Sequence, residues 1–394
     1  MINNSPLRIG LIVGETSGAI LALGMIKQIL AKYPNCQIEG IGSQELVNLG
    51  MKSLFDMNEL SVMGLFEVLK HLPRLLHIRK TVVTHFLNNP PDVFIGVDAP
   101  DFNLRVETSL KEAGIPTVHY VSPTVWAWRE KRIHKIAKAT NLVLGIFPFE
   151  QKIYHKYQLP FKFVGHTMAD DVPLVVDQAA ARTKLGLDSH TGQASSPLLA
   201  LLPGSRAREI DSLLNIFLQT FEKLKEDMPN LRAIIPAVNQ ARMVQVNLIL
   251  KASPYQQAIT VTRSPARDVM IASDAVLLAS GTAALEAMLC KRPMVVAYKM
   301  SALTHLIMGR LYKPAYFSLP NILANELLVP EFLQEDVNAK NLAKHLQKVW
   351  AQDSEITALL VDKFTEIHKS LKCDADKTSA DAVLSIIGKE GVNG

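Results

Sequence analysis

Arg8-Ile9-Gly10-Leu11-Ile12-Val13-Gly14-Glu15-Thr16-Ser17-Gly18 is the stretch that decides the fold class. Its first half is a short apolar run that ends at a glycine, and such runs are typical of strands buried on both faces of a sheet. A turn follows, and residues 20–32 then carry the spacing of a helix. A strand that leads directly into a helix is the building unit of a parallel sheet. The stretch therefore predicts an α/β fold.

The same unit recurs along the chain. Further helical spacing occurs at residues 104–113, 133–139, 209–225 and 240–251. The apolar runs that alternate with helical segments are residues 37–42, 93–97, 117–121, 142–147 and 161–164, followed by 198–202, 233–236, 258–262, 275–279 and 294–297. This alternation predicts doubly wound parallel sheets.

A polar stretch at residues 177–196 interrupts the alternation, which restarts after it. From residue 339 onward the pattern is almost entirely helical. We therefore predict two Rossmann-like domains that face a cleft, at residues 1–174 and 175–365. A C-terminal helix within residues 366–394 is expected to pack back on the N-terminal domain.

Composition excludes several classes of protein. The 394 residues suffice for two or three domains, and a formal net charge of +5 is too mild to favour a nucleic-acid partner. Cys36, Cys290 and Cys373 lie far apart, which predicts neither a disulfide framework nor a metal site and favours a reducing compartment. No run of 18 apolar residues occurs, so we expect no transmembrane helix.

Candidate residues of the first half follow two strands, because ligands of such sheets bind beyond the carboxyl ends of the strands. Gly14, Glu15 and Ser17 form a turn whose backbone N–H groups suit a ligand, although Ser17 can equally be a helix N-cap. Asp98 ends the run 93–97 and is our candidate general base. The alternative interpretation makes Asp101 or Asn103 a cap of the next helix.

Another loop of the first half follows residues 117–121. Ser122 opens it and is a candidate for substrate binding, and Trp126 and Trp128 follow. Tryptophans in such a loop grip sugars or acyl chains, or they seal the edge of a core. We favour the structural interpretation for both tryptophans.

In the second half, Gly204, Ser205 and Arg206 lie between a strand and a helix. Backbone donors, a hydroxyl and a guanidinium at a helix N-terminus make a cradle for a diphosphate. The alternative is a capped helix beside a solvated arginine. Gly204 favours the binding site, because it permits close approach of a ligand.

Ser280, Gly281 and Thr282 make a similar turn after residues 275–279. Glu286 follows Thr282 by one helical turn, so the two side chains share a helix face. There the carboxylate is placed to accept hydrogen bonds from two hydroxyls of a ribose. The alternative is a capping turn followed by a solvated glutamate.

Residues 62–80 combine apolar and basic side chains, which is typical of a helix that lies on an anionic lipid surface. We name Val68, Leu69, Leu72 and Arg74 as candidate membrane contacts. Pro73 should kink or divide the helix. The alternative is a helix that packs on the core of its own domain.

Taken in order, several motifs resemble those of the lipid A disaccharide synthase family, which are inverting hexosyltransferases of the GT-B architecture. They are residues 96–103, 119–129, 165–170, 202–206, 279–286 and 318–321. The resemblance implies UDP-2,3-diacylglucosamine as donor and 2,3-diacylglucosamine 1-phosphate as acceptor, with no cofactor and no metal. It also implies a homodimer with exchanged C-terminal parts on the cytoplasmic face of the inner membrane.

The resemblance assigns roles to the two halves and to single residues. The N-terminal domain would bind the acceptor and face the membrane, and the C-terminal domain would bind the UDP-sugar. Asp98 would remove the proton from the acceptor hydroxyl, Arg206 would stabilise the departing UDP, and Asn321 would contact the nucleotide or the sugar.

Two departures from the family pattern stand out. Ala19 replaces the final aspartate of the first loop, which predicts that Ala19→Asp raises activity. Gly42, Ser43 and Gln44 replace an Ala-Gly-Pro turn. Two other interpretations stay open: a related UDP-sugar enzyme, such as an epimerase or a transferase with a soluble acceptor, and a non-catalytic UDP-sugar or lipid binding protein.

Overall fold

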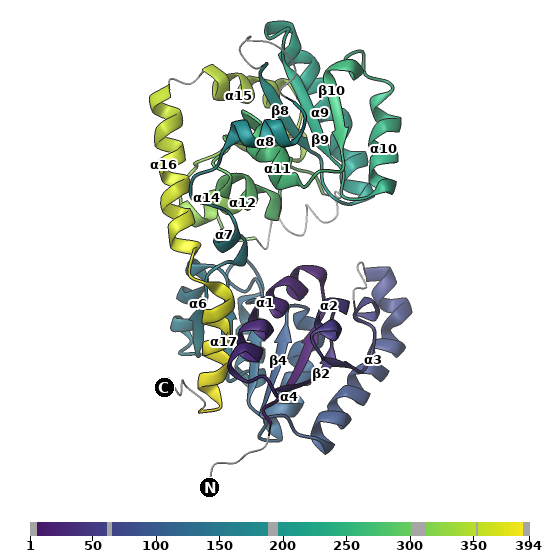
Figure 1. Ribbon diagram of the computed structural model, residues 1–394, viewed down its shortest axis with the longest axis vertical. Helices are drawn as coiled ribbons and strands as arrows, with labels where there is room; N and C mark the ends of the chain where they lie inside the picture. Colours follow the sequence, from purple (N-terminus) through teal and green to yellow (C-terminus); the bar gives the residue numbers. More distant parts are fainter. Residues whose placement is uncertain (1–5, 61–64, 188–195, 301–311, 352–353, 389–394) are drawn as a thin grey trace. The chain divides into compact units, whose positions relative to one another are not determined.

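The computed structural model describes residues 6–60, 65–187, 196–300, 312–351 and 354–388 (Figure 1). Contacts between residues divide the chain into two compact units. Unit 1 comprises residues 1–170 and 371–394, and unit 2 comprises residues 171–370. The boundaries placed from the sequence, after residues 174 and 365, lie four and five residues from these positions.

Unit 1 contains a seven-stranded sheet in the order β3-β2-β1-β4-β5-β6-β7, and all neighbouring strands are parallel. Its strands are β1 (Arg8–Val13), β2 (Gln37–Ile41), β3 (Lys52–Ser53), β4 (Val93–Val97), β5 (Thr117–Tyr120), β6 (Leu142–Gly145) and β7 (Phe161–Phe163). The central strands β1 and β4 are buried on both faces, which explains their continuous apolar runs.

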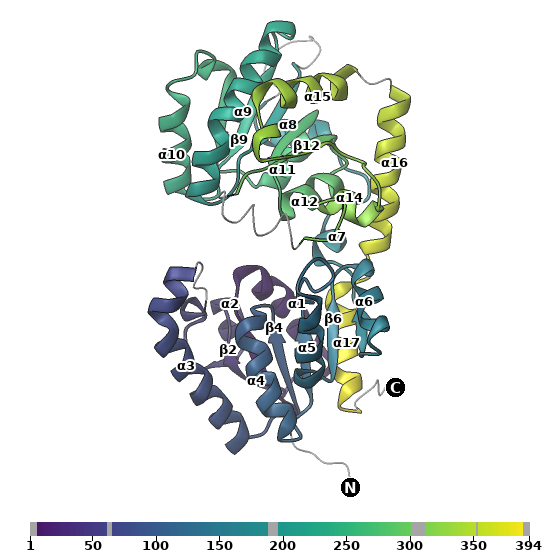
Figure 2. The same cartoon turned by 180° about the vertical axis from the view of Figure 1, so that it is seen from behind.

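Helices cover both faces of this sheet. They are α1 (Thr16–Lys32), α2 (Gln44–Asn48), α3 (Leu65–Asn88), α4 (Pro100–Glu112), α5 (Ile133–Ala139), α6 (Gln151–Lys156), α7 (Thr167–Asp171) and α17 (Ala375–Ile386), with the short 3-10 helices η1 (Met57–Glu59), η2 (Glu130–Arg132) and η3 (Pro148–Glu150). One face carries α1 and α17, which lie side by side, and the other carries α3 and α4 (Figures 1 and 2).

The C-terminal segment belongs to unit 1 because specific contacts hold it there. The Asp170 carboxylate accepts hydrogen bonds from the backbone N–H groups of Asp374 (3.0 Å) and Ala375 (2.7 Å), where α17 begins. A Cβ at Gly24 of α1 would lie 2.1 Å from Oδ1 of Asp376, so this glycine lets α17 approach closely. The apolar face of α17 then joins the core of unit 1.

Unit 2 repeats the architecture with a six-stranded sheet in the order β10-β9-β8-β11-β12-β13, again with parallel neighbours. Its strands are β8 (Leu198–Leu202), β9 (Arg232–Pro236), β10 (Ile259–Thr262), β11 (Ala275–Ala279), β12 (Met294–Tyr298) and β13 (Glu331–Leu333). Its helices are α8 (Gln178–Lys184), α9 (Ala207–Asp227), α10 (Gln240–Leu250), α11 (Ala266–Ala272), α12 (Thr282–Leu289), α14 (Leu319–Ala324), α15 (Ala339–Ala351) and α16 (Ser354–Leu371), with η4 (Gln256–Ala258) and η5 (Gln334–Asp336).

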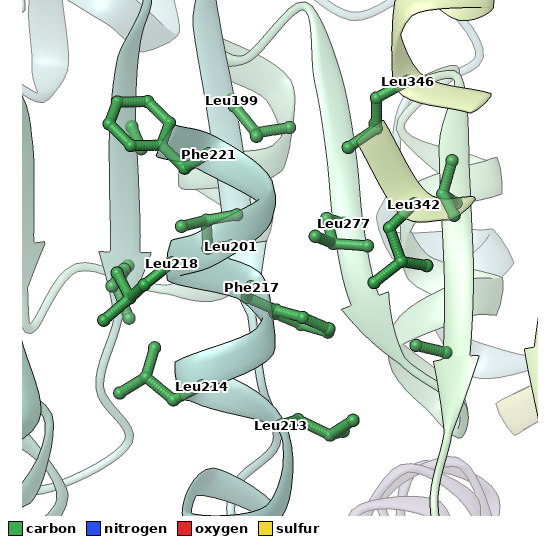
Figure 3. Close-up of a cluster of buried hydrophobic side chains, with 14 of the residues drawn as sticks. Leu199, Leu201, Leu213, Leu214, Phe217, Leu218, Phe221, Leu277, Leu342 and Leu346 are labelled. Atoms are coloured by element: carbon green, nitrogen blue, oxygen red, sulfur yellow. The ribbon is translucent and has the colours of Figure 1, made fainter. Parts of the chain in front are cut away.

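The core of unit 2 shows why its long helices form. Helix α9 repeats apolar residues every three or four positions, and Leu214, Phe217 and Phe221 are all completely buried against the sheet (Figure 3). Helix α15 adds Leu342 and Leu346 to the same cluster. Burying side chains of this size contributes about 1.5–3 kcal/mol each, so α9 is stabilised mainly by its apolar face.

The α/β fold predicted from the sequence is confirmed. Strands β3 and β13 were not predicted, because they contain only two and three residues and lack a buried apolar run. Helix α3 passes through Pro73 as one 24-residue helix, so the proline does not divide it. Pro73 is exposed, and solvent can satisfy the carbonyl that its missing N–H leaves free.

Candidate active site

In each sheet the strand order reverses between two neighbouring strands, and ligands of open α/β sheets bind at such points. The reversal lies between β1 and β4 in unit 1 and between β8 and β11 in unit 2. The turn at Gly14–Ser17 therefore neighbours Asp98 within unit 1. The turns at 204–206 and 280–282 are neighbours within unit 2.

Asp98 lies in a closely packed and strained turn. Asp98 and Ala99 both adopt the left-handed backbone conformation, with φ of 55° and 42°. A Cβ at Gly14 would lie 2.2 Å from Cβ of Ala99, and a Cβ at Gly18 would lie 3.5 Å from Cβ of Asp98. Strain of this kind costs about 1–3 kcal/mol per residue and persists only when the surroundings impose it.

Asn103 imposes that conformation. Its side chain is completely buried, and Nδ2 donates to the carbonyl oxygens of Asp98 (2.8 Å) and Val97 (3.3 Å). Neither Asn103 nor Asp101 caps α4, whose N-cap is Ala99, without a side-chain hydrogen bond. Asp101 instead forms an ion pair with Arg132. The cap interpretation of these two residues is therefore wrong.

A buried carboxyl–imidazole contact lies near Asn103, because both Asn103 and Glu107 approach the Cβ position of Gly96. Oε1 of Glu107 lies 2.7 Å from Nδ1 of His119, and both side chains are completely buried. His119 pairs in register with Gly96, whose Cβ would lie 2.1 Å from the Glu107 carboxylate. Burial raises the pKa of Glu107 above its ordinary value. This contact fixes α4, and with it Asn103, against β4 and β5.

The remaining candidates of unit 1 differ in accessibility. Ser17 is exposed and does not cap α1, whose N-cap is Glu15. Ser122 is buried, donates to the carbonyl of Pro123 (3.1 Å) and lies 2.8 Å from the Tyr154 hydroxyl. Ser122 therefore supports its loop, and the structure gives it no surface for a substrate.

The two tryptophans of that loop make internal contacts. The ring of Trp126 meets Phe149 edge-on with centroids 4.7 Å apart. The indole N–H of Trp128 donates to the Thr124 hydroxyl (3.0 Å), and the Arg129 guanidinium lies 4.1 Å from the Trp128 ring centroid. These contacts agree with the structural interpretation of both residues.

In unit 2 the turn at Gly204, Ser205 and Arg206 already contains an anion from the chain itself. Oε2 of Glu209 accepts the backbone N–H groups of Ser205 (2.9 Å) and Arg206 (3.2 Å). Gly204 has φ of +123°, and its Cβ would lie 2.4 Å from the same carboxylate oxygen. The expected backbone cradle is thus occupied by Glu209. The Arg206 side chain is 64% exposed and lies 3.5 Å from Glu209.

The second turn of unit 2 is more open. Ser280 donates its backbone N–H to Ala297 (2.8 Å), so this donor belongs to the sheet. Gly281 and Thr282 are exposed at the start of α12, where the first N–H groups of a helix lack helical acceptors. Oε1 of Glu286 accepts a hydrogen bond from Nε of Arg267 (3.2 Å). Sequence reasoning missed Arg267.

The Asn321 side chain is engaged in hydrogen bonds within the protein. It is completely buried, and Oδ1 accepts the backbone N–H groups of Leu328 and Val329, both at 2.9 Å. Its Nδ2 donates to the carbonyl of Val329 and to Glu331, again both at 2.9 Å. All hydrogen-bonding positions of this amide are occupied. Contact with a nucleotide or sugar, as expected from the sequence, finds no support in this geometry.

The proposed membrane helix α3 divides into two parts. Residues 71–77 are mostly exposed, including Leu72 (40%) and Leu76 (41%), whereas Ile78, Val82 and Phe86 are buried in the core of unit 1. The side chains of Val68 and Leu69 lie outside the described residues. Arg74, expected at lipid phosphates, forms a bidentate ion pair with Glu59 (2.6 and 3.1 Å). No helix in the described part of the chain is long and apolar enough to cross a membrane.

Unit 1 also contains a cavity of about 620 Å³ between α1, the turn after β2, and residues 53–58. Thr16, Ala19, Ile20 and Leu23 form its wall on α1. These positions share one helix face, since they follow the spacing i, i+3, i+4 and i+7. The cavity thus opens beside the turn that carries Glu15 and Ser17. Sequence reasoning did not find it, because its walls come from three separate segments.

Comparisons with known proteins agree with this arrangement. The chain is 54% identical to lipid-A-disaccharide synthase of Alteromonas mediterranea over 384 residues, which is 97% of this chain and 98% of that protein. It is 49% identical to lipid-A-disaccharide synthase of Haemophilus influenzae, with 99% and 100% of the two chains covered.

Solved structures show the same fold. UDP-GlcNAc 2-epimerase from Neisseria meningitidis, bound to UDP-GlcNAc, has a TM-score of 0.60 and 12% identity over 97% of this chain and all of that one. The glycosyltransferase of kitacinnamycin has a TM-score of 0.61 and 12% identity, with 97% and 99% covered. At this identity the likeness concerns the fold alone, and it supports the GT-B class predicted from the sequence.

The family described as Lipid-A-disaccharide synthetase matches residues 9–383. This range includes both strand-order reversals and most of α17, the C-terminal helix that returns to unit 1. Together with relatives at about half identity over the full length, the match decides among the interpretations left open by the sequence. The chain belongs to the lipid-A-disaccharide synthetase family of glycosyltransferases.

Proposed function

We propose that this chain joins UDP-2,3-diacylglucosamine to 2,3-diacylglucosamine 1-phosphate, giving the β-1′,6-linked disaccharide 1-phosphate and UDP. The observation that carries the proposal is the family match over residues 9–383, with a relative that is 54% identical over 97% of the chain. An epimerase shares the fold at only 12% identity.

The reaction needs a base for the acceptor. The acceptor oxygen forms a bond to the anomeric carbon of the donor, its proton passes to the Asp98 carboxylate, and the bond from the anomeric carbon to the diphosphate breaks toward UDP. The position of Asp98 at the strand-order reversal of unit 1 supports this role. The turn held by Asn103 keeps the carboxylate in one place, which favours proton transfer.

The departing UDP is negatively charged, and the protein must stabilise this charge. Arg206 is 64% exposed at the turn after β8, so its guanidinium can meet that charge, and the start of α12 at Thr282 offers backbone N–H groups. Glu286, held by Arg267, remains our candidate for the ribose hydroxyls. Because Glu209 already accepts the N–H groups of Ser205 and Arg206, the guanidinium carries most of the expected contact in this turn.

The test is a turnover assay with both acylated substrates, in which UDP and the disaccharide 1-phosphate are measured. We expect equal amounts of both products. UDP release without a disaccharide would point to hydrolysis. A protein that binds UDP but forms no product would support the non-catalytic interpretation.

We also propose that the exposed part of α3 binds the cytoplasmic surface of the inner membrane, where acylated substrates reside. Leu72 and Leu76 offer apolar contact, and binding should be reversible. Replacing Leu72 and Leu76 with serine should reduce sedimentation with anionic vesicles, while serine at the exposed Val244 of unit 2 should not. Unchanged sedimentation of the double variant would place the membrane contact elsewhere.

A homodimer with exchanged C-terminal parts is a further part of the proposal. The contact of α17 with α1 is made within the chain here, and an exchange would make the same contact between two chains. Light scattering of the purified protein measures its mass directly. A monomeric mass at micromolar concentration would exclude the exchange.

A further inference from the structure

The cavity beside α1 brings together two segments that the sequence analysis singled out. Ala19 lies on one wall, and Gly42, Ser43 and Gln44 lie on another. These positions are more than twenty residues apart in sequence, and only the fold makes them neighbours. Residues of α1 and of the turn after β2 therefore line one cavity of unit 1.

Several polar groups of the cavity wall already have hydrogen-bond partners within the protein. Gln44 donates to Asn48 (3.0 Å), Ser53 donates to the carbonyl of Phe55 (2.8 Å), and Asp56 accepts the backbone N–H of Asn58 (2.8 Å). A ligand therefore gains little from new hydrogen bonds here. Its main gain is contact with the apolar lining residues, which are Ala19, Ile20, Leu23, Val47 and Met57.

Charge excludes an anionic occupant. The lining contains the carboxylates of Glu45 and Asp56 and, among the described residues, no lysine, arginine or histidine. A hydrogen bond from Ser43 lowers the pKa of Glu45, so this group is ionised at neutral pH. A phosphate or diphosphate would meet only like charge there. The chemistry fits the uncharged, apolar part of a lipid.

The cavity also lies within reach of the proposed base. A Cβ added at Gly18, one residue before Ala19, would lie 3.5 Å from Cβ of Asp98. Because Ala19 follows Gly18 directly on α1, the cavity wall lies close to the turn of Asp98. An acyl chain on a sugar that stands at Asp98 can therefore reach the cavity. Glu59, one residue after the lining residue Asn58, forms an ion pair with Arg74 of α3.

We propose that this cavity binds an acyl chain of the acceptor lipid and sets which chain lengths the enzyme accepts. The proposal rests on the proposed function for the identity of the lipid. It assigns the chain to the acceptor because the cavity belongs to the unit that carries Asp98. It also reverses one expectation from the sequence: Ala19→Asp should weaken acceptor binding, since it places a carboxylate at a position that is 6% exposed without a basic partner.

Calorimetric binding of acceptors with graded acyl chains tests the proposal without turnover. For the unchanged protein, shortening the bound chain by two methylenes should weaken binding about tenfold. Ala19→Phe fills the cavity, so it should weaken binding of the long-chain acceptor at least tenfold and remove most of the dependence on chain length. UDP affinity, which belongs to unit 2, should not change.

Two further variants keep the result decisive. Ile20→Ser changes a rim residue that is 61% exposed, so it should fold even if Ala19→Phe does not, and it should reduce chain-length dependence severalfold. Val244→Ser, at a position 50% exposed on α10, is the matched control and should change nothing. Unaltered chain-length dependence in Ile20→Ser and in folded Ala19→Phe would overturn the proposal.

The same measurements separate this proposal from the proposed function. If binding affinity depends on the acyl-chain length of the donor and not on that of the acceptor, the assignment to the acceptor is wrong. If the acceptor binds with chain-length dependence that the variants remove, but no disaccharide forms, the cavity is supported and the transferase activity fails. If turnover is normal and the variants bind every acceptor equally well, only the cavity assignment fails.

Discussion

The strand-order reversals of the two units are built differently, although six strands of each sheet follow the same order. In unit 1 the turn of Asp98 is strained, packed against Gly14 and held by the buried Asn103. In unit 2 a Cβ added at Gly281 would have no atom within 4 Å, and the Arg206 side chain is 64% exposed. A fixed carboxylate suits proton transfer, whereas an open turn with a long cation suits a nucleotide that must enter and leave.

The same contrast extends below the surface. Unit 1 buries two carboxyl groups, Glu107 and Glu150, whereas no acid is buried among the described residues of unit 2. Burial raises the pKa of Glu150 to about 8. Buried polar groups of this kind specify one arrangement, because leaving any of them without a partner is costly.

The largest effect is expected from Asp98→Asn, which removes the base and keeps the shape of the turn. Oδ1 of the asparagine can still accept the Ala99 N–H that Asp98 accepts at 2.8 Å. Turnover should fall by about a hundredfold or more, the usual cost of losing a general base. UDP affinity should stay the same. A turnover number near that of the unchanged protein would remove Asp98 from the mechanism.

A matched pair of glycine variants compares the two turns directly. Gly14→Ala places a Cβ 2.2 Å from Cβ of Ala99, so the turn of Asp98 must shift, at a cost of about 1–3 kcal/mol of stability and a clear loss of turnover. Gly281→Ala meets no atom within 4 Å, so its cost is the backbone strain at φ +156°, about 1–3 kcal/mol, without a shift of neighbouring residues. Denaturant unfolding and turnover assays measure both. Equal losses of turnover would contradict the contrast between the units.

Arg206→Ala should weaken UDP binding by about tenfold and leave the fold intact, since the side chain is exposed and its loss removes one charge-assisted contact. Arg208→Ala, two residues later and also exposed, is the control for net charge. Titration with UDP distinguishes them. The same affinity in both variants would show that Arg206 acts only through its charge at long range, or not at all.

The smallest effect concerns stability and pH. The pKa of Glu150 is about 8 in the folded chain, well above 4.5, so the folded state holds a proton that the unfolded state loses. This contribution to stability is complete below about pH 4.5 and disappears as the pH rises through 8. As the pH rises from 5 to 9, the Tm of Glu150→Gln should therefore increase relative to the Tm of the unchanged protein. The exposed Glu226→Gln should show no such trend, and parallel Tm curves for Glu150→Gln would refute the shift.

Much of the site's position was predictable, because it follows from the order of strands. Buried parallel strands leave continuous apolar runs, so Asp98 and the turns at 204–206 and 280–282 were found where the strands end. Arg206 shows the limit. Glu209, three residues later, stands where a capping box has its glutamate, yet we did not predict its contact with the helix start and expected a diphosphate there instead.

Asn321 and Ser122 show what no local signal reveals. Each lies within an informative motif, yet the side chain of each makes a structural contact. Asn321 contacts Glu331, and Ser122 contacts Tyr154. A motif gives the residue type and its place along the chain. It does not say whether the side chain turns toward the ligand or toward the core.

The sequence by itself determined two α/β units, the positions of the turns that end their central strands, and the family. These features are local, because periodicity and turn residues act over a few neighbours. The tertiary structure alone decided which groups are free to act. Asn103 holds Asp98 while its amide also lies 3.5 Å from the carbonyl of Ile12, 91 residues away, and Ala19 meets Ser43 only across a cavity. Hydrogen bonds and cavities of this kind depend on segments that the chain brings together only when it folds.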